Sequence, residues 1–305
     1  HGPEAQALAL AAAYRAYIAL GRPLHRASQL LYIAQRAADW PLVATLTAEL
    51  RAAFAKGQFD PAWGSPRTHV NWCDSADWNA GLMQSFSRHA VPQVRSDRPR
   101  SEPLEGRRLR IGYLSSDFRD HATARLIKGM LRHHDRSRVQ VTLYCSGWDD
   151  GSALRREVLL LAEAAYSVSQ LNDQAAADLM RSHKLDVLID LNGPTKGQRL
   201  GILALRPAPV LVHYLGWPGS LGGRIVDYVV GDAYVTPPAQ DRLLPERVIR
   251  LGGTYQVNDH DTQPRPKVPT RAEAGPLADH LHRGVAHAPP GVGDEPVHLD
   301  EQRHP

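Results

Sequence analysis

The chain has 305 residues, which is enough for one large domain or two smaller ones, each with its own hydrophobic core. Its formal net charge is only +4 and no run of five Lys or Arg residues occurs, so we expect no nucleic-acid partner. Cys73 and Cys145 lie far apart without a CxxC pair, which argues against a disulfide scaffold and a thiolate zinc site.

No apolar stretch reaches the length needed to cross a bilayer, and no signal peptide is recognisable. We therefore expect no membrane partner. A cytoplasmic location follows as an expectation, in which both thiols stay reduced and buried.

Residues 3–56 are dominated by Ala, Leu and Arg and predict helices. Apolar side chains recur at every fourth position in the second half of this stretch: Leu42, Leu46, Leu50 and Phe54. Gly21 and Gly57 stand where the helices are expected to stop. Paired helices of this composition are typical of a helical repeat array, and must pack on the next segment of the chain or belong to a longer array.

Residues 57–100 are mixed in composition. They predict one further helix from about Ser75 to His89, with Asp74 or Ser75 as its N-cap. Residues 94–108 are polar and rich in Pro and Arg, which is typical of a linker into the next domain.

From Leu109 onward, short apolar strands alternate with helices. The expected strands lie at Leu109–Leu114, Val139–Cys145, Leu185–Gly193, 208–216, Ile225–Asp232 and 247–253. Residues 153–166 are expected to form one of the helices between them. Continuously apolar strands separated by helices predict an α/β fold with a Rossmann-like parallel sheet and helices on both faces.

After Asp261 the apolar period is lost, and Pro and His are frequent. We expect this segment to be disordered. A His-rich metal-binding tail is the functional alternative, and a slipped reading frame near Gly275 is another explanation of the change. The expected domain organisation is a helical segment 1–58, a helical and linker segment 59–108, an α/β lobe 109–260 and a tail 261–305.

Ligands of an open parallel sheet bind beyond the carboxyl ends of its strands, which selects four loops. These loops, polar or glycine-rich, are 115–121, 146–151, 192–197 and 216–223. His121 stands just before an expected helix at 122, where the positive end of the helix dipole favours a neutral imidazole. Such a ring can accept a proton or a hydrogen bond in the crevice, although capping and surface histidines are commoner.

The fourth loop is predicted to form a backbone cradle, because its glycines Gly216, Gly219, Gly222 and Gly223 permit close approach of a phosphate or a peptide. A tight connection without a ligand is the alternative. Lys196 and Arg206 could neutralise a phosphate or remain solvated. Asp190 ends a buried strand and could serve the site or cap a loop. No P-loop, HExxH, GxSxG or GxGxxG motif accompanies them.

Five ordered stretches resemble the catalytic region of the protein O-linked N-acetylglucosamine transferases. They are RIGYLSSDFRDHATARL (110–126), YCSGWDDGSALR (144–155), LDVLIDLNGPTKGQR (185–199), ALRPAPVLVHYLGWPGSLGG (204–223) and VDYVVGDAYVTPP (226–238). The match covers about Leu109 to Asp259. The chain is similar to a bacterial member of the family. The helices that precede the match resemble the tetratricopeptide helices at the front of the family's members.

The resemblance implies the N-terminal catalytic lobe of a GT-B glycosyltransferase, built as two Rossmann-like lobes around a cleft. It implies transfer of N-acetylglucosamine from UDP-N-acetylglucosamine to Ser or Thr of acceptor proteins or peptides, with inversion. No metal or cofactor is implied. His121 matches the histidine with a catalytic role. The residues that match substrate-binding positions are Asp117, Thr123, Lys196, Gly197, Gly216, Pro218 and Gly219. Asp190 and Asn192, two polar residues at the end of the third expected strand, are added as candidate substrate-binding residues.

The sequence departs from the family pattern at several positions. Trp217 replaces a usual tyrosine, Pro194 a usual aromatic residue, and Leu221 and Gly222 replace Ser-Gly. After Gly275 the expected second lobe, with the uridine pocket and the pyrophosphate-binding helix start, does not follow. We therefore expect this polypeptide alone to be inactive or nearly so, because one lobe cannot stabilise the departing UDP.

Three other interpretations stay open. The chain could be a non-enzymatic interaction module, with helical repeats and a vestigial α/β lobe. It could be a protein O-fucosyltransferase that uses GDP-fucose, since the nucleotide-selecting residues belong to the other lobe. It could also be a nucleotide-binding α/β protein of another kind.

Overall fold

The computed structural model describes residues 27–95 and 97–259, together with residues 8, 11, 12, 14–16, 19 and 21. These residues belong to one compact unit, His1–His260. Most of the helix expected before Gly21 lies outside the described residues. The tail 261–305, with its metal-binding and frame-slip alternatives, lies outside them as well.

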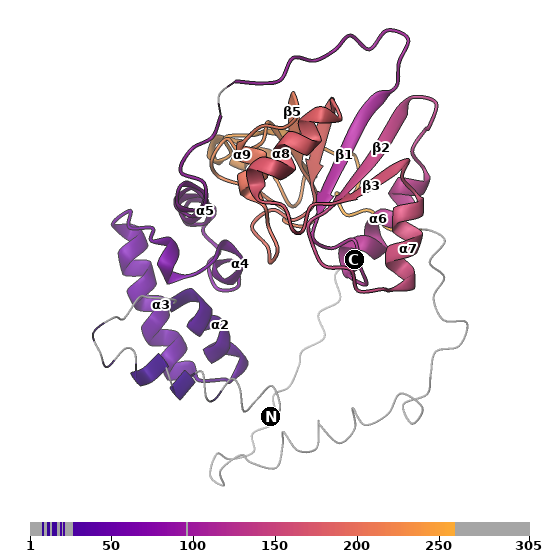
Figure 1. The fold of residues 1–305 in the computed structure, drawn as a ribbon. Helices are drawn as coiled ribbons and strands as arrows, with labels where there is room; N and C mark the ends of the chain where they lie inside the picture. The colour runs from indigo at the N-terminus through magenta and orange to yellow at the C-terminus, as the bar shows by residue number, and fades with distance from the viewer. Residues whose placement is uncertain are drawn as a thin grey trace, which may run out of the picture. The chain divides into compact units, whose positions relative to one another are not determined.

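The helical segment consists of α2 (Ala27–Arg36), α3 (Trp40–Ala55), η1 (Pro61–Trp63), α4 (Pro66–His69) and α5 (Ala76–Ala90) (Figure 1). Asp39 caps α3 by accepting a hydrogen bond from the Leu42 N–H. The predicted stripe of α3 is buried at Leu46, Leu50 and Phe54, against the buried Leu30 and Leu31 of α2. None of the helices in this described part of the chain has the length and apolar character that crossing a bilayer requires.

Helix α5 begins where the sequence predicts, because the Ser75 side chain accepts a hydrogen bond from the Trp78 N–H. Its Met83 and the C-cap residue Val91 pack into a core cluster of the α/β lobe. The Ser87 hydroxyl donates a hydrogen bond to the carbonyl oxygen of Leu221, which is buried. Helix α5 is therefore part of the wall on which the fourth loop rests.

The lobe contains seven parallel strands in the order β3-β2-β1-β4-β5-β6-β7. They are β1 (Leu109–Ser115), β2 (Val139–Cys145), β3 (Ala164–Ser167), β4 (Val187–Asp190), β5 (Val210–His213), β6 (Tyr228–Gly231) and β7 (Arg247–Arg250). The predicted α/β fold with a parallel sheet is confirmed. The four ligand-facing loops follow β1, β2, β4 and β5, as expected.

The expected helix over 153–166 is wrong in its second half. Helix α7 (Ala153–Leu160) ends early, and β3 forms the edge strand beside β2. Alanine-rich residues favour a helix locally. Backbone pairing with the neighbouring β2 strand outweighs that preference, and one helix is therefore replaced by a helix and a strand.

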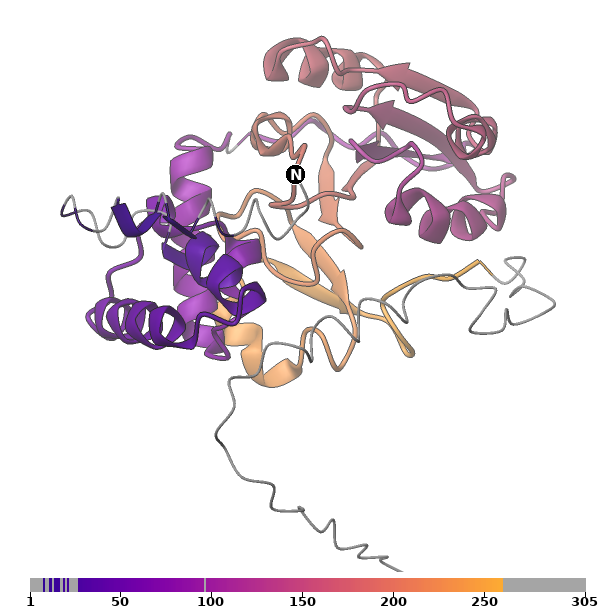
Figure 2. The same cartoon turned by 90° about the horizontal axis from the view of Figure 1, so that it is seen from below.

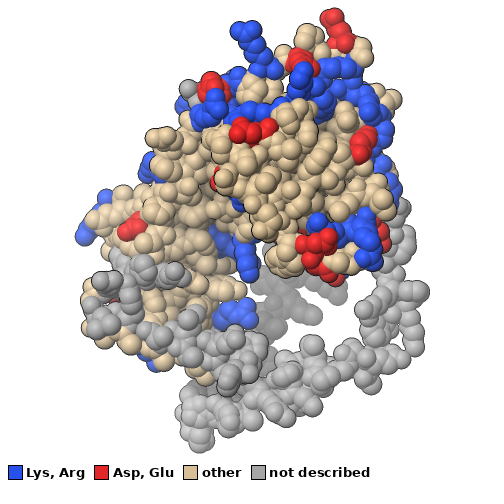
Figure 3. Space-filling view, viewed as in Figure 1, with Lys and Arg blue, Asp and Glu red and all other residues tan. Residues whose placement is uncertain are grey.

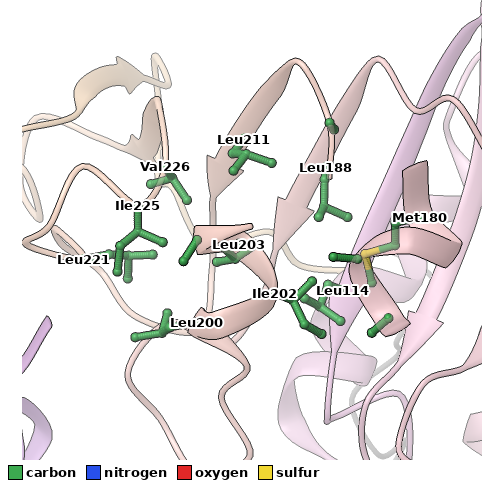
Figure 4. Close-up of a cluster of buried hydrophobic side chains, with 14 of the residues drawn as sticks. Leu114, Met180, Leu188, Leu200, Ile202, Leu203, Leu211, Leu221, Ile225 and Val226 are labelled. Atoms are coloured by element: carbon green, nitrogen blue, oxygen red, sulfur yellow. The ribbon is translucent and has the colours of Figure 1, made fainter. Parts of the chain in front are cut away.

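Helices cover both faces of the sheet (Figures 1 and 2): α6 (Ala122–Arg132) and α7 lie on one face, and α8 (Asp173–Ser182) and α9 (Leu200–Ala204) on the other. Neighbouring residues of β1 point to opposite faces, so Tyr113 packs with α6 and Leu114 with α8 and α9. Figure 4 shows the cluster that contains Leu114, where side chains of α8 and α9 meet those of the strands and of the chain near Ile225.

Candidate active site

The four strand-end loops line one cavity of about 670 Å³, which we call the strand-end cavity. The first loop contributes more of the lining residues than any other loop, and residues outside the four loops add to the wall. The described residues that line it are Arg67, Ser116, Asp117, Arg119, His121, Thr123, Ser146, Gly147, Trp148, Ser169, Gln170, Thr195, Lys196, Gly197 and Gly216. The convergence expected from the sheet topology is thus present.

The first and third loops are held together by the buried amide of Asn192. Its Oδ1 accepts a hydrogen bond from the Ser116 N–H at 2.8 Å. Its Nδ2 donates to Ser116 Oγ and to Asp117 Oδ2, both at 2.9 Å. Asn192 is therefore a support beneath the cavity, and it fixes the direction of the Asp117 carboxylate.

Asp190 lies deeper still and does not line the cavity. Its Oδ2 accepts hydrogen bonds from the Gly193 N–H at 2.7 Å and from His213 Nδ1 at 2.9 Å. Both Asp190 and His213 are buried. The structure thus places Asp190 as the anchor of the turn that begins the third loop.

His121 is the N-cap residue of α6, and its side chain is 39% exposed. Its Nδ1 accepts a hydrogen bond from the Thr123 N–H at 3.2 Å, which places the proton of the neutral ring on Nε2. Nε2 has no partner among the described residues and is the ring nitrogen available to a ligand. Asp117 Oδ2 lies 3.8 Å from Nδ1, beside the same edge of the ring.

Two glycines of the predicted site are required by close backbone approach. A Cβ on Gly197, whose φ is +85°, would lie 2.6 Å from Ser116 Oγ. A Cβ on Gly216 would lie 2.1 Å from the Leu191 carbonyl oxygen. Both distances are far inside van der Waals contact, so any larger residue would push the third and fourth loops away from the cavity.

Pro218 and Gly219 do not line the strand-end cavity. They line a separate cavity of about 230 Å³ between the fourth loop, α5 and η2 (Pro238–Leu243). The fourth loop therefore meets the strand-end cavity only through Gly216. A continuous phosphate cradle along all four of its glycines is not what the described residues form.

Sequence reasoning singled out neither Arg119 nor Trp148 as a site residue, yet both line the strand-end cavity. The Arg119 guanidinium donates a hydrogen bond to Asp117 Oδ1 at 3.1 Å and stacks on the Trp148 ring at 4.3 Å from its centroid. Trp148 is 60% exposed. A tryptophan in an expected strand-end loop was the sequence signal that could have identified Trp148.

Arg67 was missed for a different reason. It lies in α4, outside the α/β lobe, and reaches the strand-end cavity only because the helical segment packs near the third loop. No motif marks it. Among the described residues, no group of three or more His, Cys, Asp or Glu side chains is arranged to hold a metal ion.

The family model for glycosyl transferase family 41 matches residues 90–271. A probable UDP-N-acetylglucosamine–peptide N-acetylglucosaminyltransferase of Arabidopsis thaliana is 38% identical over 50% of this chain and 16% of its own length. The corresponding enzyme of Caenorhabditis elegans is 36% identical over 56% of this chain and 15% of its own. The chain thus spans about one sixth of the length of these curated relatives.

A solved structure gives the same result. A mutant O-GlcNAc transferase from Thermobaculum terrenum aligns with a TM-score of 0.52 and 26% identity, over 88% of this chain and 57% of that one. The family model matches more than half of the chain, within the region whose loops form the strand-end cavity. The chain therefore belongs to glycosyl transferase family 41.

Proposed function

We propose that this chain provides the acceptor-side lobe of a protein O-linked N-acetylglucosamine transferase. In this reaction a Ser or Thr hydroxyl attacks the anomeric carbon of UDP-N-acetylglucosamine, the bond from that carbon to the phosphate breaks, and UDP leaves with inversion. The observation that carries the proposal is the convergence of four strand-end loops on one cavity, with His121 in its wall and the Nε2 of its ring unpartnered by any residue that the structure describes.

His121 is proposed as the catalytic residue. Because Nδ1 accepts from the Thr123 N–H, the neutral ring donates from Nε2, which can hydrogen-bond to an oxygen of the acceptor or the sugar and hold it in line for attack. Acting as a general base at Nε2 would first require the proton to move to Nδ1, where the Asp117 carboxylate could receive the hydrogen bond. Thr123 serves by fixing the ring through its backbone N–H.

The other proposed substrate-binding residues divide into three groups. Asp117, Lys196, Gly197 and Gly216 line the strand-end cavity and are proposed to face the substrates. Asp190 and Asn192 are proposed to act from beneath, by holding the loops. Pro218 and Gly219 are proposed to contact the acceptor from the cavity beside α5.

The proposed partners are acceptor proteins or peptides and the sugar nucleotide, with no nucleic acid, membrane, metal or cofactor. The proposed location is cytoplasmic, supported by two free and buried cysteines, Cys73 and Cys145. Transfer of fucose from GDP-fucose is the competing reaction on the same lobe. A non-enzymatic interaction module is the competing function.

The decisive experiment replaces the equivalent segment of the Thermobaculum terrenum enzyme with residues 27–259 of this chain, which include α5 and Arg67. Mass spectrometry then follows the addition of N-acetylhexosamine to a Ser-containing peptide. We expect the chimera to transfer the sugar, and this chain alone to do so very slowly. A folded chimera that binds UDP but never modifies the peptide would show that this lobe does not support sugar transfer. That result is the one expected of a non-enzymatic interaction module.

A further inference from the structure

A second cavity adjoins the strand-end cavity. It has a volume of about 870 Å³ and lies between α2, α4 and the third loop; we call it the helix-side cavity. Arg67, Thr195, Lys196 and Gly197 line both cavities. A ligand that passes from one cavity to the other must therefore pass the side chains of Arg67 and Lys196.

Arg67 and Lys196 carry uncompensated charge. Both are exposed, and neither side chain forms an ion pair or hydrogen bond with another described residue. Among the described residues that line the two cavities, Asp117 is the one acidic residue, and it is buried, paired with Arg119 and bonded to Asn192. Facing walls of one charge sign raise the local concentration of oppositely charged groups.

The charges at the opposite end of the sheet behave differently. Figure 3 shows many Lys and Arg side chains over the end of the lobe where the strands begin, with Asp and Glu among them. There Arg107 pairs with Asp186 at 2.7 Å, and Arg110 and Lys184 with Glu102 at 2.8 and 3.1 Å. These three cations are therefore compensated by neighbouring carboxylates, whereas among the described residues Arg67 and Lys196 are not.

The lining of the helix-side cavity suits an extended peptide. Its lining includes amide and hydroxyl groups of Gln29, Tyr32 and Asn71 as well as apolar groups such as Ile33 and Phe86. Backbone and side chains of a peptide can use both kinds of contact. A diphosphate would instead favour clustered backbone N–H groups, and the glycines of the fourth loop contribute only Gly216 to the strand-end cavity.

We propose that Arg67 and Lys196 select acceptors that carry an acidic side chain next to the modified Ser or Thr. The inference rests on the proposed function and adds to that function a preference for negatively charged acceptors. The acceptor segment lies in the helix-side cavity, its hydroxyl enters the strand-end cavity, and an Asp or Glu carboxylate between them pairs with the two cations.

The test measures binding without the donor. Three fluorescent peptides share one Ser-centred sequence and carry Asp, Asn or Lys beside the serine, and fluorescence anisotropy with the full chain gives the three dissociation constants. We expect the Asp peptide to bind roughly fivefold more tightly than the Asn peptide, the size expected for two partly solvated ion pairs, and the Lys peptide least tightly. High salt should reduce the difference.

Charge reversal assigns the preference to these residues. Arg67→Glu and Lys196→Glu should each remove most of the Asp preference, and the double variant should favour the Lys peptide. Arg88→Glu is the matched control, because Arg88 is an exposed cation of α5 that lines none of these cavities. Equal binding of the Asp and Asn peptides, no binding of any peptide, or an equal effect of Arg88→Glu would overturn the proposal.

Competition with UDP separates the remaining possibility. Suppose that UDP displaces the Asp peptide and that Arg67→Glu weakens the binding of UDP as much as the binding of the peptide. The two cations then bind the donor phosphates, and the inference is wrong. A charge-selective chain whose chimera transfers no sugar would refute the proposed function alone. A transferring chimera without charge preference would refute this inference alone.

Discussion

The buried imidazole of His213 lies between the Asp190 carboxylate, 2.9 Å from Nδ1, and the Trp217 carbonyl oxygen, 2.8 Å from Nε2. Both partners are acceptors, and Asp190 Oδ2 also accepts the Gly193 N–H. The ring is thus held between a buried carboxylate and a backbone carbonyl oxygen. This arrangement joins the end of β4 to the fourth loop beneath the candidate site.

Replacement of His213 by Phe should lower the free energy of unfolding by about 3 kcal/mol, because the Asp190 carboxylate is left buried without its partner. Urea unfolding at neutral pH measures the loss. The double variant Asp190→Asn with His213→Phe removes both partners of the contact and should recover part of the lost stability. Equal stability of the single variant and the wild-type chain would show that the contact does not stabilise the fold.

His121→Ala should lower transfer by the chimera about 100-fold or more, the usual range for a positioned acid or base. It should also cost about 1 kcal/mol of stability, because the N-cap of α6 is lost. His121→Asn keeps a capping oxygen and should restore the stability without restoring the rate. If His121→Asn transfers sugar at the wild-type rate, the ring has no part in the reaction.

Trp148→Ala should weaken the binding of the acceptor peptide more than it lowers the stability of the fold. The ring is 60% exposed and stacks on Arg119, so its removal should change the unfolding free energy by only about 0.5–1 kcal/mol. Peptide affinity should fall roughly threefold, because the Arg119 guanidinium then loses the ring on which it stacks beside the strand-end cavity. The free energy of one such cation–π contact corresponds to a change in affinity of about that size. Trp148→Phe should retain most of the affinity. Anisotropy and urea unfolding check the two effects, and unchanged affinity in Trp148→Ala would remove Trp148 from the site.

The helical segment should lose stability in mild acid because of His69. Burial lowers the pKa of His69 to about 4, below its ordinary value of 6.5. The unfolded chain therefore binds the proton first, and the stability present above pH 6.5 is lost as the pH falls from there towards 4. A shift of this size corresponds to about 3 kcal/mol. His69→Phe should flatten the pH dependence of the urea midpoint between pH 7 and pH 4.5, and an equally steep profile in that variant would assign the loss to other groups.

The positions of the site loops were predictable because they depend on local patterns. Apolar runs such as 109–114 and 139–145 marked strands, and the polar residues after them had to lie at one edge of a parallel sheet. Edge strand β3 was not predictable in this way. Its residues Ala164–Ser167 are alanine-rich and largely exposed, so neither propensity nor burial marks them as a strand.

The sequence by itself determined the α/β lobe, the four loops and the place of His121 at the start of α6, since strand period, turn residues and capping act over a few neighbouring positions. Only the tertiary structure decided that Asp190 and Asn192 lie beneath the cavity, that Pro218 and Gly219 face α5, and that Arg67 reaches the site. Those outcomes depend on packing between segments far apart in the chain, where side-chain volume and burial select the contacts and no local pattern records them.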